Sequence, residues 1–204
     1  MPDRQRTRGR PSGSTTAATR ARLLRAAREV FAEQGYSGAA ISDIVARAGV
    51  SPPVLYHHFE SKAGLYAAAT AEVYDAVLGH LEPAVAGLQS FTDCVDRILV
   101  ESVRIHAADP TMAAFIVSAP VTINAYPELG LLNSHLRRTE AFYERVVAVT
   151  GGLSGHSPTA SLRVLRILVW GSTRMSAGLP DAAEFAEAVD ALRALIGAGS
   201  RGSD

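Results

Sequence analysis

Several residue types are scarce in this sequence, and each shortage excludes a class of structure. Its 204 residues contain a single cysteine, Cys94, which excludes an internal disulfide framework and a cysteine-based zinc site. No apolar run approaches the ~20 residues needed to span a bilayer. No apolar signal-peptide core follows the arginine-rich N-terminus, so we expect a cytoplasmic protein.

Aromatic residues are also few, at 6% of the chain. Apolar residues instead recur at helical spacing, without a strand pattern or an internal repeat, so the sequence predicts an all-α protein. In the second part of the chain we expect Pro83 to end a helix, and Pro120 and Pro127 to break the stretch 111–131. The longer helices there are expected over about 63–81, 91–108, 132–150, 159–177 and 181–196.

A net charge of zero hides an asymmetry between two parts of the chain. Residues 1–62 hold 10 Lys or Arg and 5 Asp or Glu, whereas residues 63–204 hold 10 and 15. A basic first part indicates a surface that faces a polyanion, with chance clustering on solvated faces as the alternative.

Residues 1–14 have the composition of a disordered basic arm, with four arginines at alternate positions. Residues 8–11, with Arg8 and Arg10 on either side of Gly9 and Pro11 at the end, resemble the core of an AT-hook. Such a segment lies in the narrow minor groove, where negative potential attracts arginine. A tail that only solubilises the protein is an equal alternative.

Residues 15–59 predict three helices. Leu23, Ala27, Val30 and Phe31 recur as one buried stripe of a first helix that ends at Gly35. The other face of this helix is expected to be exposed and to carry Arg20, Arg22, Arg25 and Arg28. A second helix, over about 41–48, is expected to end at Gly49, because glycine can turn the chain in the left-handed conformation.

The third helix begins after Ser51, whose side chain is predicted to cap it. Two prolines follow, and they suit a first turn because its amides have no intrahelical partner. Leu55 and Phe59, four residues apart, are expected to hold the helix to the core. The side chains left outward are Tyr56, His57 and Lys62, with His58 at the margin.

Three linked motifs, TRARLLRAAREVFAEQGY, ISDIVARAGVS and VLYHHFESKAGLY, resemble the TetR family of bacterial transcriptional repressors. They cover about residues 19–66, and beyond residue 80 the resemblance is only architectural. It implies a helix-turn-helix DNA-binding domain over 15–66 after the arm 1–14. A larger helical domain over 67–204 would then bind an effector and dimerise.

The resemblance also assigns DNA contacts. In the family, a Thr or Ser that caps the second helix usually contacts a DNA phosphate. This chain has Ala40 at that position, so we expect Ser42 to make the phosphate contact instead. A family lysine that contacts phosphate matches Lys62. The third helix is the reading helix, which enters the DNA groove, and its contacts fall on Pro52, Pro53, Val54, Tyr56, His57 and His58.

These residues differ in what they can recognise. Lys62 and Tyr56 suit phosphate, which fixes register without reading sequence, although Tyr56 taken alone could be a packed aromatic. His57 is the best candidate for a base edge, and the prolines and Val54 offer only apolar contact. Because this helix has no Arg, Asn or Gln, we expect the arginine arm and DNA shape to contribute more than usual to DNA sequence specificity. A metal site on His57 and His58 is disfavoured because adjacent helical residues point in different directions.

The second part of the chain carries weaker signals. Apolar faces of the last two helices suit a dimer seam, with ordinary intrachain core as the alternative. The residues of these faces are Leu162, Leu165, Val169, Thr173, Ala188, Leu192 and Leu195. Polar or aromatic residues embedded in apolar helices are candidates for a ligand pocket, although each taken alone fits a core or surface role better. They are His106, Met112, Phe115, Asn124, Tyr126, Phe142, Trp170 and Arg174.

Together these features predict a homodimeric repressor, released by a small hydrophobic ligand from an imperfect palindrome of double-stranded DNA. An activator or a ligand-independent DNA binder is the alternative. A helical enzyme with a DNA-binding appendage is disfavoured, because we find no nucleophile–base pair, metal-ligand cluster or phosphate loop. No catalytic residue, metal or cofactor is expected.

Overall fold

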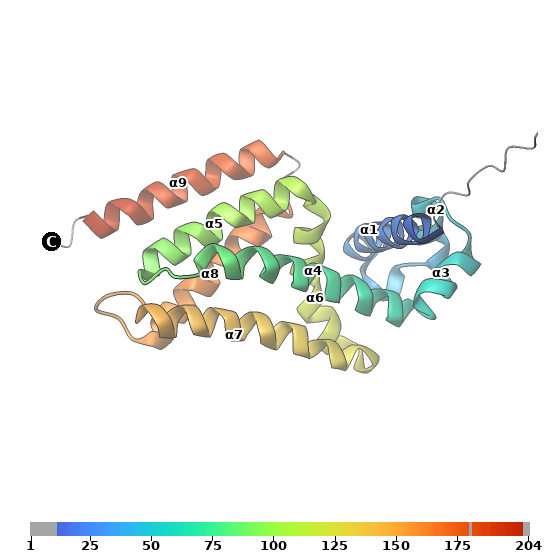
Figure 1. The fold of residues 1–204 in the computed structure, drawn as a ribbon, viewed down its shortest axis with the longest axis horizontal. Coiled ribbons are helices and arrows are strands. Elements are labelled where there is room, and N and C mark those ends of the chain that lie inside the picture. Colours follow the sequence, from blue (N-terminus) through green and yellow to red (C-terminus); the bar gives the residue numbers. More distant parts are fainter. Residues whose placement is uncertain (1–11, 180, 202–204) are drawn as a thin grey trace, which may run out of the picture.

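The computed structural model of the chain describes residues 12–179 and 181–201, and within them it contains helices, turns and connections but no strand. The all-α prediction is therefore confirmed. Figure 1 shows three helices gathered at one end, the long α4 leading away from them, and the remaining helices packed around its far half. The elements are α1 (Ser12–Gly38), α2 (Ile41–Ala48), α3 (Pro52–Phe59), α4 (Lys62–Val85), α5 (Phe91–Ala108), α6 (Pro110–Ala125), the 3-10 helix η1 (Pro127–Leu132), α7 (Asn133–Thr150), α8 (Pro158–Ser176) and α9 (Ala182–Arg201).

The first core joins α1–α3 to the rest of the molecule. The predicted α1 stripe is buried, as are Leu55 and Phe59 of α3. The same cluster includes Phe115 and Ile123 of α6, so the three-helix unit shares its core with α6 and with the first half of α4. The predicted domain boundary after residue 66 falls inside α4, which runs without interruption from Lys62 to Val85.

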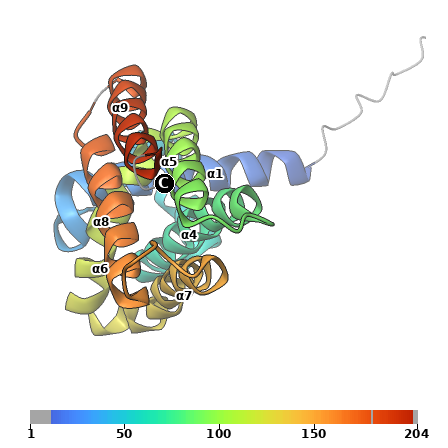
Figure 2. The same cartoon turned by 90° about the vertical axis from the view of Figure 1, so that its left-hand side faces the viewer.

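A second core fills the other end. It is built from the far half of α4 together with α5, α7, α8 and α9. Seen end-on in Figure 2, α8 and α9 lie at the periphery of this group, while α1 extends away from it. No helix in the described part of the chain is both long and apolar enough to cross a membrane.

The turns of the three-helix unit follow the prediction in part. Gly49 ends α2 in the left-handed conformation, at φ 64° and ψ 43°. Within α1, Gly35 is non-helical, and the chain then continues in helix to Gly38, three residues beyond the predicted end.

The predicted Ser51 side-chain cap is wrong. Ser51 has the extended N-cap conformation, but among the described residues its side chain accepts no capping hydrogen bond. Pro52 and Pro53 have no N–H to donate, and the next amide, that of Val54, donates to the Ser51 backbone carbonyl at 3.0 Å. Of the two amides that usually donate to a capping side chain, that of Pro53 is absent and that of Val54 is engaged by the Ser51 carbonyl, so the serine hydroxyl has no capping donor within the described chain.

Two predicted helix breaks are also wrong. Helix α4 passes through Pro83 to Val85, and α6 passes through Pro120 to Ala125. Proline costs a helix one hydrogen bond and adds a clash with the preceding turn. In α6, Ala119 and Ile123 on either side of Pro120 are buried in the first core, so tertiary packing outweighs the local penalty.

Candidate functional site

The outer face of α3 forms a small exposed surface at the end of the molecule. With Leu55 and Phe59 buried, Tyr56 is 47% exposed and His57 is exposed beside it. Tyr56 is therefore a surface side chain rather than a packed aromatic. Of the other predicted contacts on this helix, Pro52 and Pro53 are exposed, and Val54 and His58 are half-buried.

Lys62, the first residue of α4 and the only lysine in the sequence, borders this surface. Its Nζ donates to the backbone carbonyl of Ser37 at 3.1 Å and lies 5.0 Å from the ring centroid of Tyr36. Partial burial lowers the pKa of Lys62. An ammonium has three N–H donors, so the Ser37 contact orients Lys62 while leaving donors for a phosphate.

The remaining predicted DNA contacts are less constrained. Ser42 is exposed on α2, where its hydroxyl donates to the neighbouring Asp43 carboxylate at 3.3 Å. Ala40 occupies the N-cap of α2, where its methyl side chain cannot accept a capping hydrogen bond. Arg8 and Arg10 lie outside the described residues.

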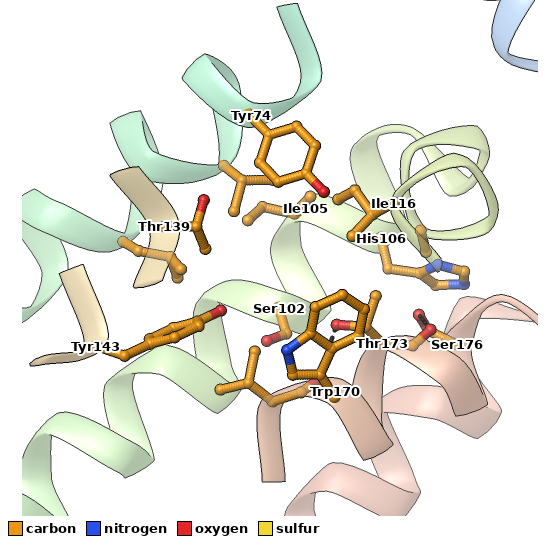
Figure 3. Close-up of a pocket in the computed structure, with 14 residues that line it drawn as sticks. Tyr74, Ser102, Ile105, His106, Ile116, Thr139, Tyr143, Trp170, Thr173 and Ser176 are labelled. Carbon is orange, nitrogen blue, oxygen red and sulfur yellow. Dashed lines mark hydrogen bonds between the residues drawn. The ribbon is translucent and has the colours of Figure 1, made fainter. Parts of the chain in front are cut away.

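A cavity of about 70 Å³ lies between α4, α5, α6, α7 and α8. Figure 3 shows the rings of Tyr74, Tyr143 and Trp170 around it, with His106 and Ser176 at one side. Most of the wall is apolar, and the polar side chains on it come from α4, α5, α7 and α8. The lining residues are Tyr74, Val77, Leu81, Ser102, Ile105, His106, Ala113, Ile116, Thr139, Tyr143, Val169, Trp170, Thr173 and Ser176.

Two of the eight predicted ligand residues, His106 and Trp170, line this cavity. The other six are placed elsewhere. Phe115 and Phe142 belong to the first and second cores, Met112 and Tyr126 pack half-buried against the first core, and Asn124 and Arg174 are exposed.

Tyr74 and Tyr143 were missed as lining residues. Both are tyrosines in amphipathic helices, a signal as good as the one that singled out Trp170. Which of several such rings face one another depends on how α4 and α7 pack, and the sequence of either helix alone does not contain that information.

Two groups of polar side chains on the wall differ in their hydrogen bonding. Four hydroxyls donate to carbonyls of their own helices: Ser102 at 2.8 Å, Thr139 at 3.3 Å, Thr173 at 2.8 Å and Ser176 at 2.9 Å. In contrast, both ring nitrogens of His106 and the hydroxyl of Tyr74 are buried without a hydrogen-bond partner among the described residues.

Protonation of these two side chains is also shifted by their surroundings. Burial lowers the pKa of His106, which favours the neutral imidazole. Burial, followed by the neighbouring Tyr66, Tyr143 and Glu140, raises the pKa of Tyr74, so the phenol keeps its proton.

An ion-pair cluster centred on the buried Arg28 side chain joins α1 to α4 and to the N-cap of α6. The Arg28 guanidinium donates to Glu72 of α4 at 2.5 Å, to Asp109 at the N-cap of α6, and to the Thr111 hydroxyl at 3.1 Å. Burial acts to raise the pKa of Asp109, but hydrogen bonds from Thr111 and the charge of Arg28 outweigh it, and the pKa is lowered. Arg28 was expected on the surface of α1; this is wrong, because α4 and α6 pack over that position.

Most of the predicted dimer residues lie within the chain's own packing. Leu165 and Val169 are buried in the second core, where they match the intrachain alternative. Leu162, Thr173, Ala188 and Leu192 are half-buried, and Leu195 is exposed. The apolar residues that α8 leaves exposed are Val164, Ile167, Trp170 and Met175.

The face of α8 was therefore assigned incorrectly for Leu165 and Val169. Nearly every turn of α8 carries apolar residues on both sides, so periodicity alone does not say which side meets the core.

Among the described residues there is no group of three or more His, Cys, Asp or Glu side chains that could hold a metal ion. The rings of His57 and His58 are 5.6 Å apart, at an angle of 69°.

Comparison with known proteins adds to this geometry. The family model described as "Bacterial regulatory proteins, tetR family" matches residues 23–69. The transcriptional regulator UidR of Escherichia coli K12 is 30% identical over 182 residues, which cover 88% of this chain and 91% of UidR. The transcriptional activator FasR of Mycolicibacterium smegmatis is 32% identical over 148 residues, covering 64% of this chain and 65% of FasR.

Among solved structures, the ketosteroid transcriptional regulator KstR2 of Mycobacterium tuberculosis has the same fold. It superposes with a TM-score of 0.70 at 19% identity, over 88% of this chain and 93% of KstR2. From the three-helix unit, the family model and the similarity to UidR along nearly its whole length, we conclude that the chain belongs to the TetR family of DNA-binding transcriptional regulators and is not an enzyme.

Proposed function

We propose that the protein is a homodimeric cytoplasmic repressor that a small, mainly hydrophobic ligand releases from an imperfectly palindromic operator. One observation carries this proposal. The cluster around the buried Arg28 side chain connects α1, which supports the DNA-facing helix, to α4 and α6, which line the cavity. A ligand in the cavity and DNA at α3 would therefore bias the same set of contacts.

On the DNA side, residues 15–66 would form the reading domain. Tyr56 and Lys62 would bind phosphate and fix the register, while His57 would read a base edge in the major groove. The excess of basic residues over residues 1–62 supports this orientation. The arm carrying Arg8 and Arg10 would add minor-groove contacts.

Residues 67–204 would both bind the ligand and form the dimer interface. Several exposed apolar side chains occur together on α8 and α9, chief among them Ile167 at 70% and Leu195 at 73%, and a group of this kind supports an interaction surface. Pairing α8 and α9 with the same helices of a second copy would make a four-helix seam. Two reading helices would then meet half-sites about one turn apart, or slightly more.

The cavity would couple ligand to DNA by linkage. At about 70 Å³ it is smaller than the ~150 Å³ engineered cavity that accepts benzene, so a ligand must move its walls. Ala113 and Ile116 of α6 belong to those walls, and Asp109 is the N-cap of the same helix. A conformation that the ligand prefers would thereby shift the Arg28 contacts, and with them the spacing of the two reading helices.

The sign of regulation has a second candidate. FasR, with 32% identity, is a transcriptional activator. An activator, or a regulator that needs no ligand, would use the same DNA-facing surface.

Footprinting upstream of the protein's own and neighbouring genes tests the proposal. We expect protection of two half-sites related by a dyad, and lower transcription from the protected promoter in a purified system. Protection of a single half-site would contradict the dimer, and higher transcription would favour the activator. A metabolite library that neither shifts the melting temperature nor releases the operator would favour the ligand-independent regulator.

A further inference from the structure

We propose that His106 and Tyr74 form a polar anchor in the cavity between α4 and α8, and that the anchor selects an uncharged, largely apolar ligand with a hydroxyl or carbonyl oxygen. This inference rests on the ligand control in the proposed function. It goes further by naming the residues that recognise the ligand and the chemistry that they require.

The two side chains stand out because their polar atoms are buried and unpaired. His106 is 3% exposed and Tyr74 is 4% exposed, yet neither ring nitrogen of His106 nor the Tyr74 hydroxyl has a partner among the described residues. Buried polar groups in folded proteins are nearly always hydrogen-bonded. A ligand oxygen placed here would supply the missing bonds, whereas the serine and threonine hydroxyls of the wall already donate within their helices.

Charge on the wall decides what kind of ligand fits. None of the described lining residues is Asp, Glu, Lys or Arg. An ionised ligand would leave water without gaining an opposite charge, which is strongly unfavourable. The lowered pKa of His106 keeps its imidazole neutral, with one donor and one acceptor nitrogen, and the raised pKa of Tyr74 keeps its O–H. Both anchors therefore suit neutral oxygen, and a hydroxyl can donate as well as accept.

The rest of the cavity suits an apolar body. Ile105, Ile116 and Val169 contribute aliphatic wall, and Figure 3 shows the Trp170 indole facing the same space as Tyr74. Phe185 of α9 packs edge-on against His106, with ring centroids 5.2 Å apart. That contact holds the imidazole in place, so the anchor is positioned before a ligand arrives.

A matched set of single-ring probes tests the anchor in the full-length protein. The set is 4-propylphenol, propylbenzene and 4-propylbenzoate, which share an apolar body and differ in the polar group. Trp170, the one tryptophan in the sequence, lies on the wall and reports binding by its fluorescence. We expect the phenol to bind at least tenfold more tightly than propylbenzene, and the carboxylate to bind most weakly.

Variants then assign that preference to residues. Tyr74→Phe removes only a hydroxyl, and His106→Leu removes both ring nitrogens. Each should bring the ratio of phenol to propylbenzene affinity toward one, while propylbenzene itself still binds. The control is Tyr66→Phe, the same change two turns earlier on α4 and outside the lining, which should leave the ratio unchanged.

Several results would overturn the anchor. These are equal affinity of the wild type for phenol and propylbenzene, tighter binding of the carboxylate, no binding of any probe, or a ratio that both variants leave intact. Operator release is measured separately. If 4-propylphenol binds with the expected selectivity but leaves operator affinity unchanged, the anchor stands and the ligand control in the proposed function fails.

Discussion

The two ends of the molecule place their important polar side chains in opposite environments. At the α3 end, Tyr56 and His57 are exposed on one short helix and depend on the core only for support. At the other end, His106 and Tyr74 are buried and face a space that five helices enclose. Exposed residues on α3 can be substituted one at a time without changing the fold, whereas the buried site depends on how several helices pack together. This difference separates variants that alter only binding from variants that also alter stability or coupling.

The largest effect on operator affinity should come from a substitution of an exposed residue far from α3. Such a result would show that DNA binding also depends on the end of the molecule opposite α3. Ile167→Asp places a charge on the exposed face of α8 and should prevent dimerisation with little cost to the folded chain. Loss of the second half-site contact should weaken operator binding by about 10²–10⁴-fold. Light scattering and gel shift measure the two effects.

The matched control for this variant is Val121→Asp, at a position of α6 that is 74% exposed. It should leave both the oligomeric state and operator affinity unchanged. If Ile167→Asp remains dimeric, the α8 seam is refuted.

The next largest effect should come from the cluster that joins the two ends. Arg28→Met leaves the Asp109 and Glu72 carboxylates without their buried partner and should lower the free energy of unfolding by about 3 kcal/mol. Urea denaturation measures this change. Arg138→Met, which breaks an exposed pair with Asp75, should cost less than ~1 kcal/mol.

Arg28→Met should also weaken the response of operator affinity to a bound probe. If coupling were unchanged in a folded variant, the cluster would be structural only, and the connection between the two ends would have to run through other contacts.

A smaller effect, confined to recognition, is expected for His57. His57→Ala should reduce discrimination at one operator base pair by about 1–3 kcal/mol, because a hydrogen bond to a base edge is lost. Competition with single-base operator variants measures it, and the melting temperature should not change. Equal losses on every sequence would mean that His57 does not read a base.

The smallest effect is expected for Lys62. Lys62→Ala should weaken specific and random DNA alike, and should reduce the slope of log affinity against log salt by about one. Because Lys62 also contacts Ser37 and Tyr36, Lys62→Gln is the better test of charge, as it keeps a donor. An unchanged salt slope in both variants would exclude a phosphate contact.

Prediction from the sequence worked best where spacing is local. The α1 stripe, the Gly49 turn and the burial of Leu55 and Phe59 each depend on residues within a few turns of one another, and all agree with the structure. Prediction failed at Ser51 because Pro53 has no N–H and the Val54 amide donates to the Ser51 backbone carbonyl instead of its side chain. At Pro120 it failed because burial of α6 outweighed the local cost of proline.

The sequence by itself determined the class of this protein, since a short helix after a glycine turn exposes the same side chains whatever packs behind it. Tertiary structure alone decided what the second part of the chain presents. It buried Arg28 against Glu72 and Asp109, 44 and 81 residues away. Of the eight predicted ligand residues, it placed His106 and Trp170 on the wall of the cavity between α4, α5, α6, α7 and α8. It also turned Leu165 inward and Ile167 outward. In helices that are apolar on several sides, the partner of each face is set by packing between distant segments rather than by periodicity within one segment.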